Sequence, residues 1–137
     1  MNSQEVIPIP MHVVETIADV IQEMYDEITR RAYEMFQEKQ WGGDSTLDLE
    51  DWLTAERELV HKPNVLVQET IHRIIVTIYL REISPLEVQL LVTRDAMLIQ
   101  GPGTGLKKVF RSVQFPRRID VNNAEALYGD GCLFLIA

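Results

Sequence analysis

The residues best suited to chemistry in this 137-residue chain are few and isolated. The single cysteine, Cys132, stands in the apolar run CLFLIA, where a thiol more often packs as a small hydrophobic group than acts as a nucleophile. The histidines are His12, His61 and His72, and their spacing matches no pattern of zinc ligands. We therefore expect no metal site, and no internal disulfide, since there is no second cysteine.

Two other stretches contain residue types that a catalytic or nucleotide site would use. Glu56 and Arg57 are adjacent in a predicted helix, so their side chains point in different directions and suit a charged, solvated face. The stretch GPGTGLKK at residues 101–108 is rich in glycine, but it has neither the spacing of a phosphate-binding loop nor a clear helix after it. The sequence thus predicts no cofactor and no enzymatic activity.

Charge is distributed unevenly along the chain. Residues 1–62 contain 14 acidic and 5 basic side chains, a net charge of −9, whereas residues 63–137 have a net charge of +1. An acidic first segment disfavours contact with a phosphate backbone, and the pairs Lys107–Lys108 and Arg117–Arg118 are too few to form a basic patch. We expect no nucleic-acid partner.

Length and hydropathy bound the class of protein. With 46% apolar residues, the chain can bury the core of one ordinary domain or of two very small ones. No run approaches the roughly 18 apolar residues of a membrane span, and MNSQEVIPIP lacks the basic and apolar regions of a signal peptide. The sequence predicts a folded cytoplasmic protein without membrane contact.

The first segment has the pattern of two helices, at about 11–39 and 48–60. No glycine or proline interrupts residues 11–39, and Pro8 and Pro10 lie upstream of the expected helix start. Asp48 is the expected N-cap of the second helix. The apolar stripe of the first helix consists of Ile17, Ile21, Met24, Ile28, Ala32 and Met35. The buried side of the second consists of Trp52, Ala55 and Leu59.

These two helices resemble a short bacterial helical domain that has no assigned function. The likeness covers residues 28–60 and rests on R-R-A-Y-E near the end of the first helix and D-W-L-x-A-E-R-E-L in the second. It implies no chemistry. The stripe residues Ile17, Ile21, Met24, Ile28 and Met35 approximate a heptad seam, which can pair with another copy or pack within the chain against Trp52 and Leu59.

After the stretch HKPN at residues 61–64, the apolar period changes to two. The seven runs with this period are VLVQET, RIIVTIYL, VQLLVT, AMLIQG, KKVFRSVQF, AEALY and CLFLIA. Pro116 is expected to end the fifth run, and Gly131 in GDG to take the positive φ of a tight hairpin. We predict an α+β chain: an acidic helical hairpin at 1–62, then an antiparallel, immunoglobulin-like β-sandwich at 63–137.

The order of motifs after residue 64 resembles the α-crystallin domain of small heat-shock proteins, the Hsp20 family. A-L-Y-G-D-G-C-L fits that family's A-x-x-x-n-G-v-L signature, VQLLVTRDAMLIQG resembles its strand pair ending in L-x-I-x-G, and FRSVQFPRRID resembles its F-x-R-x-[FV]-x-L-P-x-x-[IV]-D. The residues that carry these matches are Leu98, Ile99, Gly101, Arg111, Pro116, Asp120, Ala126, Gly131 and Leu133.

The resemblance implies an ATP-independent chaperone, a holdase that captures partly unfolded proteins through strand addition and apolar contact. In that family a groove between two strands receives short aliphatic motifs. Carried over to this chain, the groove walls are Val88, Leu90, Val92, Ala124, Ala126 and Tyr128. The alternative is that these six residues are simply part of the core.

Two features depart from the family's pattern. Members usually continue beyond the last strand with a polar tail that carries an I-x-I motif, whereas this sequence stops at Ala137, and the loop at 101–107 is short for the extra strand of bacterial and plant members. We therefore expect a homodimer or small homo-oligomer, paired through the strand around Arg111 or through the helical stripe. The competing hypothesis is an adaptor module, similar to a co-chaperone domain, that recruits one native partner.

Overall fold

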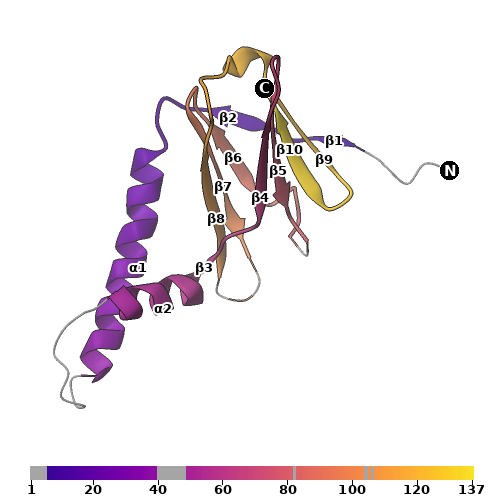
Figure 1. Ribbon diagram of the computed structural model, residues 1–137. Coiled ribbons are helices and arrows are strands. Elements are labelled where there is room, and N and C mark those ends of the chain that lie inside the picture. Colours follow the sequence, from indigo (N-terminus) through magenta and orange to yellow (C-terminus); the bar gives the residue numbers. More distant parts are fainter. Residues whose placement is uncertain (1–5, 40–48, 82, 104, 106) are drawn as a thin grey trace.

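The computed structural model describes residues 6–39, 49–81, 83–103, 105 and 107–137, and within them the chain forms two helices and two β-sheets (Figure 1). The helices are α1 (Ala18–Lys39) and α2 (Leu49–Leu59). The strands are β1 (Ile7–Pro8), β2 (Met11–Val13), β3 (Val60–His61), β4 (Val65–Glu69), β5 (Ile74–Tyr79), β6 (Gln89–Val92), β7 (Ala96–Pro102), β8 (Lys108–Gln114), β9 (Glu125–Gly129) and β10 (Cys132–Ile136). A 3-10 turn, η2 (Val121–Asn123), precedes β9.

Each sheet has five strands. Sheet A has the order β1-β9-β10-β5-β4, and sheet B has the order β2-β6-β7-β8-β3. The seven strands β4 to β10 correspond to the seven runs of period two, as predicted, and they pair with one another antiparallel. The pairs β2–β6 and β3–β8 are parallel, so sheet B is mixed.

Alternating residues of the two sheets meet in one core. In β5, Ile74, Val76 and Ile78 are at most 1% exposed and pack in the same cluster as Leu90 and Val92 of β6. Because successive side chains of a strand point to opposite faces, one face of each sheet supplies this core and the other faces outward. The architecture is therefore a β-sandwich within an α+β chain.

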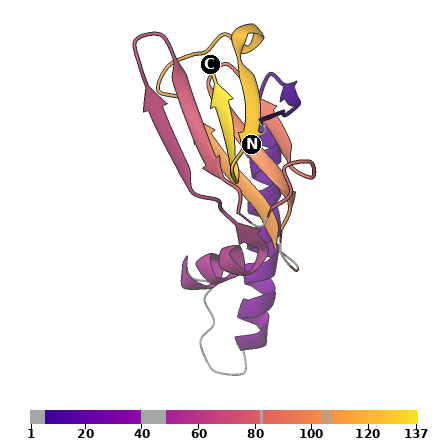
Figure 2. The same cartoon turned by 90° about the vertical axis from the view of Figure 1, so that its right-hand side faces the viewer.

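The helices cover the outer face of sheet B. Outward residues of sheet B, Leu91, Leu98 and Phe110, form a second apolar cluster with Ile28 and other residues of α1 and α2. The helix α1 runs along sheet B and continues beyond the end of the strands, where α2 crosses it (Figures 1 and 2). The outer face of sheet A lies on the opposite side of the sandwich.

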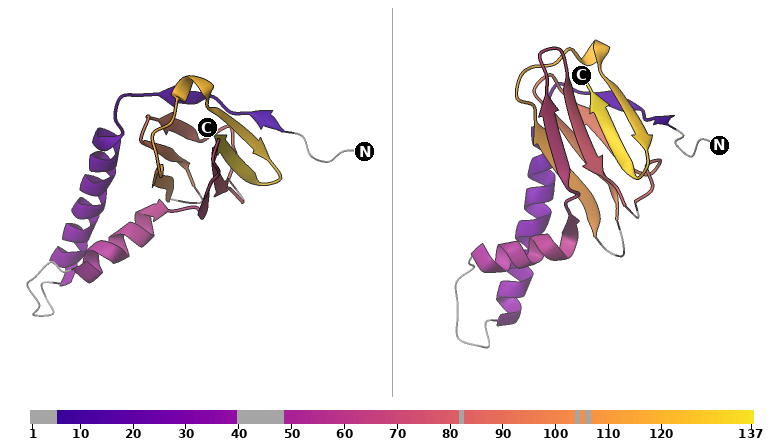
Figure 3. Two further views of the ribbon diagram at one scale, coloured as in Figure 1. Left: turned by 45° about the horizontal axis from the view of Figure 1, so that its top comes forward. Right: turned by 45° about the vertical axis from the view of Figure 1, so that its right-hand side comes forward.

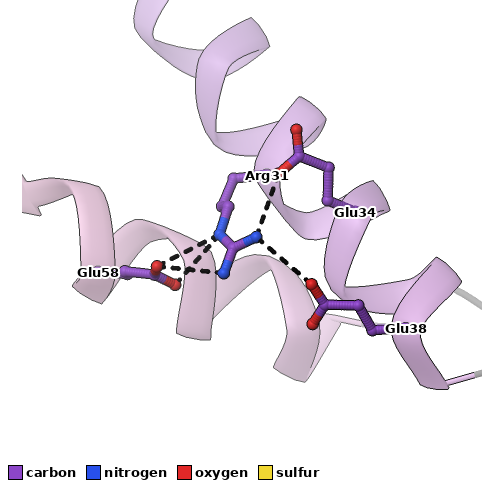
Figure 4. Close-up of polar contacts among 4 residues, drawn as sticks. All are labelled: Arg31, Glu34, Glu38 and Glu58. Atoms are coloured by element: carbon purple, nitrogen blue, oxygen red, sulfur yellow. Dashed lines mark hydrogen bonds and ion pairs between the residues drawn. The ribbon is translucent and has the colours of Figure 1, made fainter.

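A charged cluster joins the two helices (Figure 4). The guanidinium of Arg31 on α1 lies 3.2 Å from a carboxylate oxygen of Glu58 on α2, 3.1 Å from Glu34 and 4.0 Å from Glu38. The hydrogen bonds with Glu58 and then with Glu34 raise the pKa of Arg31 above its ordinary value. One arginine thus offsets three carboxylates where the acidic helices meet.

The first helix begins later than its sequence pattern suggests. It starts at Ala18, whose amide N–H donates to Oγ1 of Thr16 at 3.1 Å, and not near Met11. Residues Met11–Val13 instead pair with Leu90–Val92 at the edge of sheet B. These sheet hydrogen bonds prevail over the apolar spacing that favours a helix there. The expected N-cap, Asp48, lies outside the described residues.

Residues 7–13 and 60–61 therefore supply strands to both sheets, although they precede the boundary predicted between helical and β segments. The division of the chain at residue 62 stays a prediction. The helices and sheet B share one apolar cluster, so in the structure the two segments pack against each other.

Candidate functional site

The edge strands β9 and β6 of the two sheets are bridged by the chain's own N-terminal segment, residues 7–13, which we call the strap. Its first half adds to sheet A, with Ile7 opposite Tyr128 and the amide N–H of Ile9 donating to the carbonyl of Ala126 at 2.9 Å. Its second half is β2, which adds to β6. Figure 3 shows the strap running from one sheet to the other along one side of the sandwich.

The strap is packed as well as hydrogen-bonded. Ile9 is only 5% exposed and belongs to the core between the sheets, and Met11 packs against that core. Proline is tolerated at a sheet edge because its missing N–H need not continue a ladder. Pro8 therefore fits the outermost strand of sheet A, and it discourages the pairing of a further strand there.

The structure brings the six predicted groove residues together beneath this strap. On the β6 side, Leu90 and Val92 are fully buried, and Val88 lies just before the strand. On the β9 side, Ala126 is 3% exposed. All six belong to the core or pack against it, with Val88, Ala124 and Tyr128 half-buried. Their role as walls of a binding groove stays a prediction, since the strap already covers them.

Sequence reasoning missed the strap, although a signal for it was present. The stretch VIPIP places Ile7 and Ile9 two residues apart with prolines between and after them. Proline favours extended backbone in the residue before it, so the pattern indicates an edge strand. Two- and three-residue strands such as β1 and β2 are too short to show a period of their own.

The motif residues occupy positions with clear structural roles. Gly131 has φ of 77° and Asp130 has φ of 54° in the β9–β10 turn, as expected for a tight hairpin. A Cβ at Gly101 would stand 3.0 Å from the carbonyl oxygen of Glu87 and the Cα of Val88, so a larger residue there would have to displace the backbone before β6. Pro116 follows the end of β8, and Leu133 is fully buried.

The helical stripe faces the protein's own sheet. Ile17, Met24 and Ile28 are at most 9% exposed in the cluster with sheet B, Met35 packs against that cluster, and Ile21 is 36% exposed. The alternative of packing within the chain is therefore realised. Pairing with another copy along this stripe stays a prediction, and it would require α1 to leave sheet B.

A cleft of about 390 Å³ lies between α1, α2 and the free part of β8. Its wall includes Tyr25 and Trp52, whose ring centroids are 5.3 Å apart, and Arg111 of β8.

Glu56, which also lines this cleft, forms an ion pair with Lys62 at 2.8 Å. Arg57 donates instead to Thr54 at 3.3 Å, so the adjacent pair Glu56–Arg57 points to different partners, as expected. Arg57 is exposed, whereas the side chain of Glu56 is only 18% exposed, so the expected solvated face holds for Arg57 and not for Glu56.

The outer face of sheet A carries apolar side chains, and neither helix packs over it, since both pack on sheet B. The register aligns Leu66, Thr77, Phe134, Leu127 and Pro8 in one row across all five strands. A second row contains Gln68, Ile75, Ile136 and Glu125, and a third contains Tyr79, Cys132 and Gly129. Leu66 and Tyr79 are 44% and 42% exposed, and Phe134 and Ile136 are half-buried.

Within the described ranges, no group of three or more His, Cys, Asp or Glu side chains is arranged to hold a metal ion. In the same part of the chain, neither helix has the length and apolar character that a membrane crossing needs.

The chain was compared with protein families, curated proteins and solved structures. No protein-family model matches the chain, and no curated protein matches it. Among solved structures it is similar to heat shock protein 16.0 from Schizosaccharomyces pombe, with 19% sequence identity and a TM-score of 0.49. The match covers 56% of this chain and 65% of the other, which is less than two thirds of that protein's length. A likeness at this level carries no inference about what the present chain binds.

Proposed function

We propose that this chain is an ATP-independent holdase of the small heat-shock type, built on an α-crystallin-like sandwich, and that it binds non-native proteins and prevents their aggregation. The motif order from Leu98 to Leu133 supports the family, and the two-sheet sandwich is the architecture which that family implies. The proposal includes no enzymatic activity and no cofactor, and it places the protein in the cytoplasm.

The observation that carries the proposal is the seating of the strap. An extended segment with isoleucines at alternate positions adds to β9 as a strand and inserts Ile9 between the sheets. Strand addition uses main-chain hydrogen bonds for affinity and side-chain pockets for preference. The groove between β6 and β9 is therefore suited to extended aliphatic segments, which unfolded proteins expose and folded proteins bury.

In this mechanism a client competes with the strap. The main-chain groups of β6 and β9 that pair with residues 7–13 become available to a client only when the strap leaves. A holdase needs no energy input for such an exchange, since binding of the unfolded ensemble is an equilibrium process.

The docked strap also favours the second candidate function, an adaptor that recruits one native partner. A groove that is closed in the free protein is less available to unrelated clients, and this suits an adaptor that opens for one native partner. The two functions differ in promiscuity: a holdase suppresses the aggregation of unrelated proteins, and an adaptor does not.

The test is light scattering of two unrelated heat-aggregating proteins, without ATP, at equal subunit concentrations of this chain. Suppression of both clients supports the holdase, and suppression of neither by the folded protein refutes it. Suppression of one alone favours the adaptor. Ile9→Ala opens the groove and should increase suppression, whereas Leu98→Ala is the control, because it removes an equally buried side chain from the far face of sheet B.

A further inference from the structure

We propose that the outer face of sheet A is a self-association surface, on which a second copy of this chain packs sheet against sheet about a two-fold axis near Phe134. The inference does not rest on the holdase function, because its test contains no client. It rests on the contrast between the two outer faces of the sandwich, on charge and on the position of one aromatic residue.

The two outer faces are both apolar, but the chain covers only one of them in its described part. Leu91, Leu98 and Phe110 of sheet B are buried under the helices. The corresponding face of sheet A has no helix over it (Figures 1 and 3). An apolar patch of a few hundred Å² on a soluble protein is often a functional surface.

Charge favours a second copy as that partner. Of the eleven outward positions on β4, β5, β10 and β9, only Glu125 carries a charge, although the whole chain has a net charge of −8. The acidity is concentrated in residues 1–62, most of which form the helical layer on the far side of sheet B. A nearly uncharged face cannot form ion pairs with a charged partner. Two copies of such a face can meet without charge repulsion.

The layer order keeps the acidic parts of two such copies apart. Packed layers lie about 10 Å from one another, so contact through sheet A leaves the two helical layers about 50 Å apart. The Debye length at physiological salt is about 8 Å, and repulsion between the helical layers is therefore screened. Contact through the helices would instead bring the acidic segments together.

Phe134 is placed where a two-fold contact has most effect. It is the middle residue of β10, which is the central strand of sheet A, and its register neighbours are Thr77 on one side and Leu127 on the other. In a two-fold interface the same patch meets itself, so an axis near this point brings Phe134 onto its counterpart in the second copy. Buried aromatic residues at the centre of an interface contribute most of its binding energy.

The size of the face sets the strength of the association. Five strands at a spacing of about 4.8 Å and a length of about five residues give roughly 400 Å² per copy, or about 800 Å² in total. Interfaces of this size are weak and transient. We expect a dissociation constant on the order of 10–100 µM.

The experiment is sedimentation velocity of the full chain across concentrations from about 5 to 500 µM, which bracket that range. The wild-type chain should shift from monomer to dimer. Phe134→Lys and Phe134→Glu should each remain monomeric over the whole series, because like charges then meet at the axis. Leu86→Lys is the matched control: Leu86 is 79% exposed and lies in the loop before β6, away from the face.

An equimolar mixture of Phe134→Lys and Phe134→Glu should restore the dimer, since the opposite charges face each other only if residue 134 meets its counterpart. Circular dichroism verifies that each variant is folded. The proposal is overturned by a wild-type chain that stays monomeric at every concentration, by a dimer that persists in both Phe134 variants, or by a mixture that stays monomeric.

Discussion

Replacement of Ile9 by alanine tests whether the strap is an integral part of the sandwich. Ile9 is 5% exposed between the sheets, and an Ile→Ala change at a buried site costs about 2–5 kcal/mol. The strap is a short edge segment that can relax into the space, so we expect a loss near the lower end, about 2–3 kcal/mol. For a chain of this size, that corresponds to a fall of about 8–12 °C in the melting temperature.

The matched control is Ile7→Ala, which removes the same side-chain atoms from the same segment, the strap. Ile7 is 39% exposed opposite Tyr128, so its replacement should cost only about 0.5–1 kcal/mol. Urea unfolding followed by circular dichroism measures both free energies. Hydrogen exchange gives a second, local measurement, because the amides of Ile9 and Val14 donate to Ala126 and Val92 at 2.9 and 3.0 Å and should be protected.

The reasoning fails if the two variants lose the same small free energy and the Ile9 amide exchanges as fast as an open chain. That result would mean that the strap is undocked in solution and that the groove is already open. If Ile9→Ala loses the expected free energy of unfolding and the Ile9 amide is protected from exchange, the strap is an integral part of the sandwich.

Two further substitutions test local features of the fold. Arg31→Ala removes the cation shared by Glu34, Glu38 and Glu58 and should lower the midpoint of urea unfolding slightly at low salt and by less at high salt. The hydrogen bonds with Glu58 and Glu34 raise the pKa of Arg31, so the arginine stays charged, and a loss that is as large at high salt as at low salt would contradict the electrostatic origin. Gly131→Ala should cost about 1 kcal/mol in urea unfolding, because φ at that position is 77°. Gly105→Ala should show a similar loss, because φ at that position is 69°, and equal stability of Gly131→Ala and wild type would refute the strain.

The seven main strands were predictable because each has four or more residues, enough for a run of β-branched and apolar residues with a period of two to show in the sequence. In β5, for example, Ile74, Val76 and Ile78 face the core and Tyr79 faces outward, and this period is visible in the letters of the sequence. The helical stripe was predictable in the same way. Periodicity identifies residues that share a face, but it does not say what covers that face, so the contact between Ile28 and sheet B could not be deduced.

The strap and β3 could not be read by period, because each pairs through only two or three residues. Their conformation depends on an edge of another strand that lies far away in the sequence: Met11 pairs with Leu90, and Val60 pairs with Lys108. Such long-range pairing prevailed over the local helical spacing at residues 11–17. The six predicted groove residues all belong to the core or pack against it, and their role as groove walls stays a prediction. The segment that pairs with β6 and β9 was not foreseen.

The strap links the stability of the fold to the proposed holdase activity. When a binding site is accessible in only a fraction of molecules, the apparent affinity falls by that fraction. If Ile9→Ala weakens strap docking by about 2–3 kcal/mol, the open fraction rises about 30- to 150-fold while it remains small. Client capture through the groove should rise with it, up to the point at which the groove is open in most molecules. Capture through the outer face of sheet A would not change, because that face is open whether or not the strap is docked. The response of Ile9→Ala in the aggregation assay therefore identifies which of the two apolar surfaces meets a client.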